Sequence, residues 1–409
     1  MKNVWIFNHY AQEPGGAGGT RHYQLAKSLP GHGWEATIVA ASVEHQSGRQ
    51  RLTGSESERL VQYDGVPFLW VKTSTYQGNG GARMRNMLQY AWQVLKPGKM
   101  AGLKRPDVII GSSVHPFAAA AAAVLAWRYK VPFVFEVRDL WPETLIDMGR
   151  LERTSMIARG LRMLEKWLYQ RAKRIVVLLP KAHEYIVPMG IDAKKIFWIP
   201  NGVDLAGFPS FDEKNESEKF VLMYFGAHGP ANGLENVLRA QQLIEKRPEL
   251  ENVCLRIIGE GPCKRDLITI ASDLNLKRVS FEDSVPKRKI PELAAEANAF
   301  VFNLINAPVF KYGISSNKLF DFMAARRPIL FCCDAGNNPV ADSGAGYTVD
   351  PGDPSALADA VARLYRLKAT ERAEMGLAGR RYVEVEHGFV KLAGKLADCL
   401  NEACESHKS

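Results

Sequence analysis

The sequence has no hydrophobic run long enough to cross a lipid bilayer. Its longest apolar stretch, Phe117 to Trp127, has eleven residues, whereas a spanning helix needs about 20. The chain starts with only a short apolar run at residues 4–7 and then turns polar, which favours a buried first strand over a secretory signal peptide. Any membrane contact is therefore expected to be peripheral.

Cysteine is scarce, and the usual cofactor motifs are missing. The six cysteines show no metal-ligand spacing with histidine, and there is no Asp-x-Asp pair, no G-x-x-x-x-G-K-[ST] loop and no G-x-G-x-x-G fingerprint. These absences exclude a P-loop and a standard dinucleotide site. We expect no metal and no cofactor, and the cysteine usage favours a reducing cytoplasm.

Basic residues are concentrated in the first half of the chain. Residues 1–205 hold 27 Lys and Arg against 16 Asp and Glu, whereas residues 206–409 hold 26 against 28. Two stretches, 49–105 and 150–174, carry most of the excess. Such a surface suits anionic lipid headgroups, lipid pyrophosphates or nucleic acid. A merely solubilising face is an equal alternative.

Apolar β-branched runs alternate with helix-period stretches along the 409 residues. This pattern predicts an α/β protein with two parallel, doubly wound sheets. We expect Rossmann-like domains at residues 1–210 and 211–380, and a C-terminal helix at 381–409 that packs back on the first domain. The expected strands are 4–7, 36–39, 107–110, 133–137, 174–178, 196–199, 221–225, 253–258, 279–281, 299–303 and 329–331; expected helices include 23–29, 117–129, 156–171, 234–244, 265–274 and 290–297.

The segment 313–330 is the strongest candidate site. A polar loop leads into a short helix, and the amides of its first turn, at Ser316, Asn317 and Leu319, can receive an anion. Lys318 adds a positive charge beside them, and Asp321, one turn later, can accept hydrogen bonds from the hydroxyls of a ribose. The alternative is a capped core helix with no ligand.

Glycine-rich loops follow the first strand of each predicted domain. In the first domain, Gly18 and Gly19 let the backbone approach an anion, and Arg21 can neutralise its charge. In the second domain the candidates for the same task are Gly226, His228, Gly229 and Asn232. A further turn at Gly259 is expected to be structural more often than ligand-binding.

Polar clusters also close two neighbouring strands of the first domain. His115 precedes a helix and can donate to a sugar hydroxyl, while Glu136, Arg138 and Asp139 can bind or activate an acceptor. The alternatives are a histidine that caps the helix and a buried Arg–Asp pair.

These pieces, in this order, resemble a retaining GT-B glycosyltransferase of the glycogen-synthase-like family four. The resemblance covers nearly the whole chain and rests on the stretches 15–19, 107–115, 199–204, 226–233, 255–262 and 321–330. The stretch Glu136 to Glu143, with Ser316-Asn317-Lys318, further resembles bacterial O-antigen and capsule enzymes, including N-acetyl-L-fucosamine transferases.

The resemblance implies two domains facing a central cleft and catalysis by His115, Lys318 and Asp321 without a metal. The implied donor is a nucleotide-sugar, of which a UDP-linked N-acetylated amino sugar is the expected case. The acceptor would be a lipid-pyrophosphate saccharide at the cytoplasmic face of the inner membrane, and no nucleic acid would bind.

Three positions depart from the family pattern. Gly313 stands where a first glutamate is usual, and Ala227 and Asn232 replace an Arg and a Lys that usually hold the diphosphate. Two other functions therefore stay open: a nucleotide-sugar 2-epimerase of the same fold, and a non-catalytic nucleotide-sugar-binding protein.

Overall fold

A computed structural model of the chain describes residues 1–15, 20–44, 47–76, 78, 80–113, 115–208 and 219–408. The chain forms two compact units: residues 1–201 with 389–409, and residues 202–388. The sequence placed the boundary near residue 210 and the final helix from residue 381. The second unit begins earlier because the Val203 amide donates to the His387 carbonyl at 3.0 Å, which ties this segment to the end of the same unit.

The sheet of the first unit has the strand order β3-β4-β2-β1-β5-β6-β7-β8. Seven strands are parallel, as predicted, whereas β3, an edge strand that the sequence did not predict, runs antiparallel to β4. The missed hairpin turns at Asp64-Gly65, both with positive φ, as two-residue hairpins require. The strands are β1 Lys2–Phe7, β2 Trp34–Ala41, β3 Glu58–Tyr63, β4 Val66–Val71, β5 Val108–Ser112, β6 Phe133–Val137, β7 Arg174–Val177 and β8 Ile196–Trp198.

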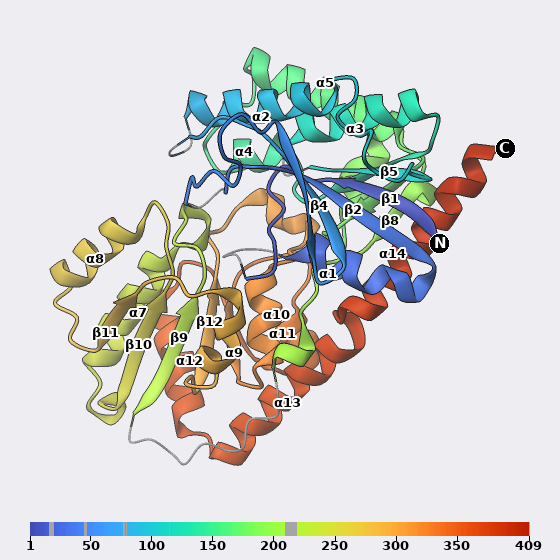
Figure 1. Cartoon of the computed structure of the whole chain (residues 1–409). Coiled ribbons are helices and arrows are strands. Elements are labelled where there is room, and N and C mark those ends of the chain that lie inside the picture. The colour runs from blue at the N-terminus through green and yellow to red at the C-terminus, as the bar shows by residue number, and fades with distance from the viewer. Residues whose placement is uncertain are drawn as a thin grey trace. The chain divides into compact units, whose positions relative to one another are not determined.

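Helices cover both faces of this sheet. On β1, Val4 and Ile6 belong to a core shared with the first and last helices, whereas Trp5 meets Tyr129 edge-on at 5.0 Å, as the two-residue period of a strand requires. Figure 1 shows α2, α3 and α5 side by side, and α3 packs against both of the others. The helices are α1 Arg21–Ser28, α2 Gly81–Val94, α3 Pro116–Tyr129, α4 Glu143–Asp147, α5 Met156–Arg171, α6 His183–Ile186 and α14 Phe389–Lys408, with short 3-10 turns η1 Leu29–His32, η2 Val187–Met189 and η3 Ala193–Lys195.

The sheet of the second unit is fully parallel, in the order β11-β10-β9-β12-β13-β14. Its strands are β9 Phe220–Phe225, β10 Val253–Ile258, β11 Val279–Glu282, β12 Ala299–Asn303, β13 Ile329–Cys332 and β14 Gly346–Val349. The sequence prediction missed only β14, which is short and follows a Gly-rich segment. With helices on both faces, each unit is Rossmann-like, and the predicted fold class is confirmed.

The helices of the second unit connect successive strands and then extend beyond the sheet. They are α7 Leu234–Glu245, α8 Lys264–Asp273, α9 Ile290–Ala294, α10 Asn317–Ala324, α11 Pro339–Ser343, α12 Pro354–Arg366 and α13 Ala369–Glu386, with 3-10 turns η4 Leu205–Gly207, η5 Pro230–Asn232, η6 Pro248–Leu250, η7 Lys287–Lys289 and η8 Pro308–Tyr312. Arg380 on α13 donates to the Ala324 carbonyl at 3.2 Å. This bond holds the end of α10, the helix of the candidate site.

Candidate functional site

Two glycines bring the loops after β9 and β10 into direct backbone contact. The Gly226 amide donates to the Ile258 carbonyl at 2.9 Å, and the His228 amide donates to the Glu260 carbonyl at 2.8 Å. A Cβ on Gly259 would lie 1.9 Å from the Gly226 oxygen, and the φ of Gly259 is +144°. Only glycine fits at this position, so Gly259 shapes the loop that contains Gly226.

His228 lies fully buried at the centre of this loop. Within the described residues neither ring nitrogen forms a hydrogen bond of ordinary geometry, although the Ile258 carbonyl is near enough to favour the protonated ring. Burial and the charge of Lys264 together lower the pKa of His228. The ring is therefore neutral at physiological pH and keeps unused polar atoms beside the candidate site. Gly229 follows it and leads into η5.

Lys318 lies half-buried between both parts of the candidate site. Its ammonium donates to the Tyr224 hydroxyl at 3.0 Å and to the side-chain oxygen of Asn232, and it lies 5.2 Å from the Phe302 ring centre. Burial lowers the pKa of Lys318 to about 7. Lys318 is therefore not a solvent-facing cation. Asn232, one of the departures from the family pattern, instead holds this lysine.

Two backbone amides at the N-terminus of α10 face the candidate site. Ser316 is the residue before the helix, and no side chain among the described residues caps it. The Leu319 amide donates to the Ser316 carbonyl at 3.1 Å and its side chain is fully buried, so the side chain belongs to the core and the amide is already paired. The amides of Asn317 and Lys318 are left at the tip, where a helix favours an anion.

Asp321 has an ion-pair partner, Lys287, that was not predicted from the sequence. Asp321 is 4% exposed, and its carboxylate forms an ion pair with Lys287 in η7. The basic run 287–289 was the available signal, but nothing in the sequence shows that it meets α10. Any hydroxyl that binds Asp321 must share the carboxylate with this ammonium. Within the described ranges, no three His, Cys, Asp or Glu side chains form a group suited to a metal.

In the first unit, Glu136 joins a buried network instead of facing an open site. Arg21 donates to Glu136 at 2.9 Å and to the Ile199 carbonyl at 2.8 Å. The Asn8 amide donates to Nδ1 of His22 at 2.8 Å, so Nε2 of His22 donates to Glu136 at 2.6 Å. Burial raises the pKa of Glu136, but His22 and Arg21 outweigh burial and hold it well below its usual range. Arg21 and Glu136 are thus joined to each other.

His115 takes the alternative role that the sequence allowed, as the cap of α3. Its Nδ1 accepts from the Ala118 amide at 3.3 Å, and its Nε2 lies 2.6 Å from Nδ1 of His9. Because Nδ1 accepts, the proton is on Nε2 and is donated to His9. The ring is fully buried, and burial holds its pKa well below the usual range. His115 therefore caps α3 and positions His9, and its contact with a sugar stays a prediction.

The remaining candidates of the first unit are Arg138, Asp139, Gly18 and Gly19. Arg138 is half-buried and Asp139 exposed, and among the described residues no ion pair joins them. The expected alternative of a buried Arg–Asp pair was therefore wrong, since the buried arginine of this region is Arg21. Gly18 and Gly19 lie outside the described residues.

Comparison with known proteins defines the class of this chain. Residues 16–202 match the family profile of the glycosyl transferase 4-like domain, and residues 219–366 match that of glycosyl transferases group 1. The chain is a GT-B glycosyltransferase. The second profile spans the Lys318 site, and the first includes Arg21, His22 and Glu136.

Relatives and solved structures agree with this assignment. The chain is 25% identical over 317 residues to the probable glycosyltransferase WbjE of Pseudomonas aeruginosa, covering 75% of this chain and 77% of that protein. It is 21% identical to the putative colanic acid biosynthesis glycosyl transferase WcaI of Escherichia coli, covering 43% of this chain and 46% of WcaI. The fold of this glycosyltransferase matches a sucrose-phosphate synthase from Thermosynechococcus elongatus, with a TM-score of 0.76, 16% identity and coverage of 97% and 98%. It also matches Anabaena HepE in complex with UDP and glucose, with a TM-score of 0.68, 14% identity and coverage of 98% and 99%.

Proposed function

We propose that this glycosyltransferase moves a sugar, with retention of anomeric configuration, from a nucleotide-sugar to a lipid-pyrophosphate-linked saccharide. We infer UDP as the nucleotide and an N-acetylated amino sugar as the transferred group. The product would belong to a bacterial surface polysaccharide such as O-antigen or capsule, made at the cytoplasmic face of the membrane. Support comes from HepE, which was solved with UDP, and from WcaI, named for colanic acid biosynthesis.

The observation that carries the proposal is the placement of Lys318. Its ammonium lies at the start of α10, whose first amides have no side-chain cap among the described residues, and it is oriented by Tyr224 and Asn232. Cleavage of a sugar–diphosphate bond builds negative charge on the departing phosphate. Donors already fixed around that charge lower the barrier, because they need no reorganisation during the reaction.

The other residues take supporting roles in this proposal. Asp321 would accept hydrogen bonds from the ribose while it stays in its ion pair with Lys287. Gly226 and Gly259 would let the diphosphate approach the loop backbone, next to the buried His228 ring. The departing phosphate would help to deprotonate the acceptor hydroxyl, so that no second carboxylate is needed. Arg138 and Asp139, which keep exposed surface, would contact the acceptor.

A panel of UDP-, GDP- and dTDP-sugars, each with and without a lipid-pyrophosphate saccharide, tests the proposal. Nucleotide release that requires the acceptor, with the anomeric configuration of the donor kept in the product by NMR, would support it. A changed sugar without acceptor would indicate an epimerase, and binding without turnover would indicate a non-catalytic protein. Lys318→Ala should lower turnover at least about 100-fold, whereas Lys289→Ala, an exposed lysine on η7, should not.

A further inference from the structure

Large apolar side chains are exposed on three helices of the first unit. Trp92 on α2 and Trp127 on α3 keep 67% and 69% of their surface exposed, and Met156 on α5 keeps 77%. The full set on these helices is Met84, Leu88, Trp92, Trp127, Met156, Ile157, Met163 and Trp167. Because α3 packs between α2 and α5 (Figure 1), these residues share one layer, which we call the outer helical face.

The apolar residues of α5 form a stripe that points away from the core. Met156, Met163 and Trp167 are spaced by seven and four residues, so they align on one side of the helix. The buried residues of α5 are Ala158, Glu165, Leu168 and Tyr169, which fall on the opposite side. On α2, Met84, Leu88 and Trp92 follow the same four-residue spacing, again opposite buried residues. Each helix is therefore apolar on two sides.

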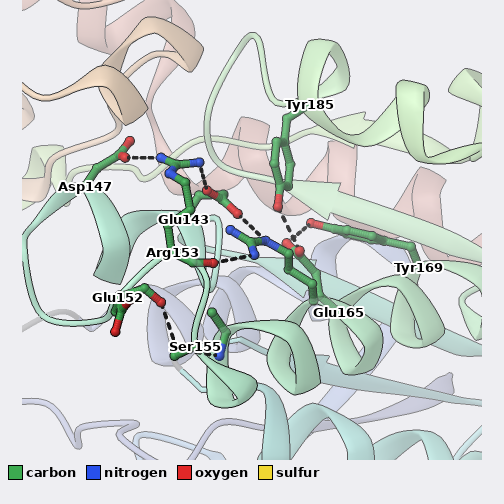
Figure 2. Close-up of polar contacts among 10 residues, drawn as sticks. Glu143, Asp147, Glu152, Arg153, Ser155, Glu165, Tyr169 and Tyr185 are labelled. Atoms are coloured by element: carbon green, nitrogen blue, oxygen red, sulfur yellow. Dashed lines mark hydrogen bonds and ion pairs between the residues drawn. The ribbon is translucent and has the colours of Figure 1, made fainter.

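Polar contacts on the inner side fix the orientation of α5, as Figure 2 shows. The Tyr169 and Tyr185 hydroxyls each donate to Glu165 at 2.9 Å. Near the start of the helix, Arg162 donates to Glu143 at 2.8 Å, and Arg153 bonds to the same carboxylate. The helix cannot rotate to bury its outer stripe without breaking these bonds. The exposed stripe is thus a fixed feature of the surface.

The charge of the outer helical face is of one sign. Glu165 is the only acidic residue of α5, and it is buried; α2 has none. Burial raises the pKa of Glu165 to about 8, so it is neutral at physiological pH. Arg85, Arg159, Lys166 and Arg171 are exposed beside the apolar stripes, and no ion pair to them occurs among the described residues. Cations flanking an apolar stripe match the boundary between acyl chains and anionic headgroups.

A basic groove continues this face at the ends of α3 and α5. It is lined by the apolar residues of the α3–β6 connection and by Trp127. Its charged or titratable lining residues are all basic: Arg128, Lys130, Arg171, Lys173 and His407. Trp92, Trp127 and Trp167 lie toward the C-terminal ends of the three helices, one on each. Tryptophan prefers the membrane–water interface, so aromatic anchors and headgroup cations coincide.

We propose that the outer helical face of α2, α3 and α5 docks on an anionic lipid bilayer, with its apolar stripes in the headgroup–acyl boundary. No helix in the described part of the chain has the length and hydropathy of a membrane span. A second copy of the chain is a poorer occupant, because a two-fold contact would place these cations against each other. This inference deepens the proposed function. It rests on that function in one respect only, namely that the acceptor is a lipid-linked saccharide in the membrane.

Vesicle flotation of the full chain tests the docking surface. The wild type should bind vesicles of phosphatidylcholine with 30 mol% phosphatidylglycerol and should bind pure phosphatidylcholine much less, because each cation near anionic lipid is expected to raise the affinity about fivefold. Because salt screens these charges, the protein should dissociate as the salt concentration rises. The double variant Arg159→Glu with Lys166→Glu should bind at least about 25-fold more weakly. The quadruple variant Leu88→Ser, Trp92→Ser, Met156→Ser and Met163→Ser should lose insertion, measured as quenching of tryptophan fluorescence by brominated lipid.

Matched controls lie in the same unit but outside α2, α3 and α5. Val390→Ser on α14 and Lys181→Glu with Lys194→Glu change exposed residues of the same kinds and should leave binding unchanged. If the outer-face variants bind vesicles as well as the wild type does and unfold at the same temperature, the inference is overturned. It is also overturned if the wild type forms a dimer without lipid and these variants dissociate that dimer. Transfer to a water-soluble acceptor analogue should persist in the variants. Vesicle binding without any transfer activity would instead overturn the proposed function and leave the docking surface standing.

Discussion

The lowered pKa of Lys318 makes a quantitative prediction about donor binding. In the free protein the ammonium is surrounded by Tyr224, Phe302 and Asn232, and burial brings its pKa to about 7. A bound diphosphate favours the charged form and raises this pKa, so binding takes up a proton. Affinity should therefore be full below pH 7 and fall as the pH rises through 7.

The size of the effect follows from the protonated fraction of Lys318. With a pKa of about 7, roughly nine-tenths of the lysine is charged at pH 6 and roughly one-tenth at pH 8. Affinity should then drop about tenfold between these values, or about 1.4 kcal/mol. Burial lowers the pKa of the neighbouring His228 below its ordinary value.

Isothermal titration calorimetry with a UDP-sugar measures this dependence directly. A UDP-sugar is a suitable ligand for this test, because both of its phosphates are esterified and no terminal phosphate titrates near pH 6. Lys318→Met should bind weakly and with no slope between pH 6 and 8, and buffers of different ionisation enthalpy should show proton uptake only in the wild type. Lys289→Ala should keep the slope. A flat wild-type profile, or a slope that survives in Lys318→Met, would refute the assignment of Lys318 to the phosphates.

Three further predictions concern stability. In the folded protein the pKa of Glu165 is about 8, so the stability that its protonated carboxyl contributes is full below about pH 4 and is lost as the pH rises to 8. Measured by urea unfolding, the free energy of unfolding of Glu165→Gln should therefore rise relative to that of the wild type by up to roughly 4 kcal/mol across that range. Gly259→Ala, whose Cβ would meet the Gly226 oxygen, should cost at least ~3 kcal/mol in thermal unfolding, whereas Gly352→Ala, with positive φ in open space, should cost only ~1 kcal/mol. Glu136→Ala leaves the buried Arg21 without its carboxylate partner and should lower the free energy of unfolding by about 3–5 kcal/mol. Adding Arg21→Met should restore part of this loss in the double variant. If the losses of the two single variants simply add in the double variant, the two residues are not coupled and the network is contradicted.

The sequence predicts the elements of this fold better than their partners. Strands such as Phe133–Val137 and Val253–Ile258, and the helix Met156–Arg171, match their predicted bounds, because periodic burial is a local signal. The hairpin at 58–71 was missed because its first strand begins with two charged residues and has no buried position, although Asp64-Gly65 was an available turn signal. Pairing is not local: nothing near Asp321 in sequence indicates Lys287, and nothing near Arg21 indicates Glu136.

The candidate site shows the same division between type and environment. Residue type and position made Lys318, Asn232 and Asp321 candidates for a site, and the structure brings Lys318 and Asn232 into contact. Their surroundings could not be predicted, because burial depends on which strands end beside them. His115 illustrates the difference: a histidine before a helix has two readings from sequence, and only the neighbouring His9 and the Ala118 amide decide that it is a cap.

The division of the chain into units has a consequence for its synthesis. The second unit is one continuous segment, whereas the core of the first includes Leu392, Leu396 and Leu400 from α14. A ribosome therefore delivers the Lys318 unit complete while the first unit still lacks its last helix. Contacts between residues so distant in sequence form slowly, and a segment that waits for them exposes apolar surface in the meantime. The order of completion is thus reversed along the chain: the half that is translated first is the half that finishes folding last.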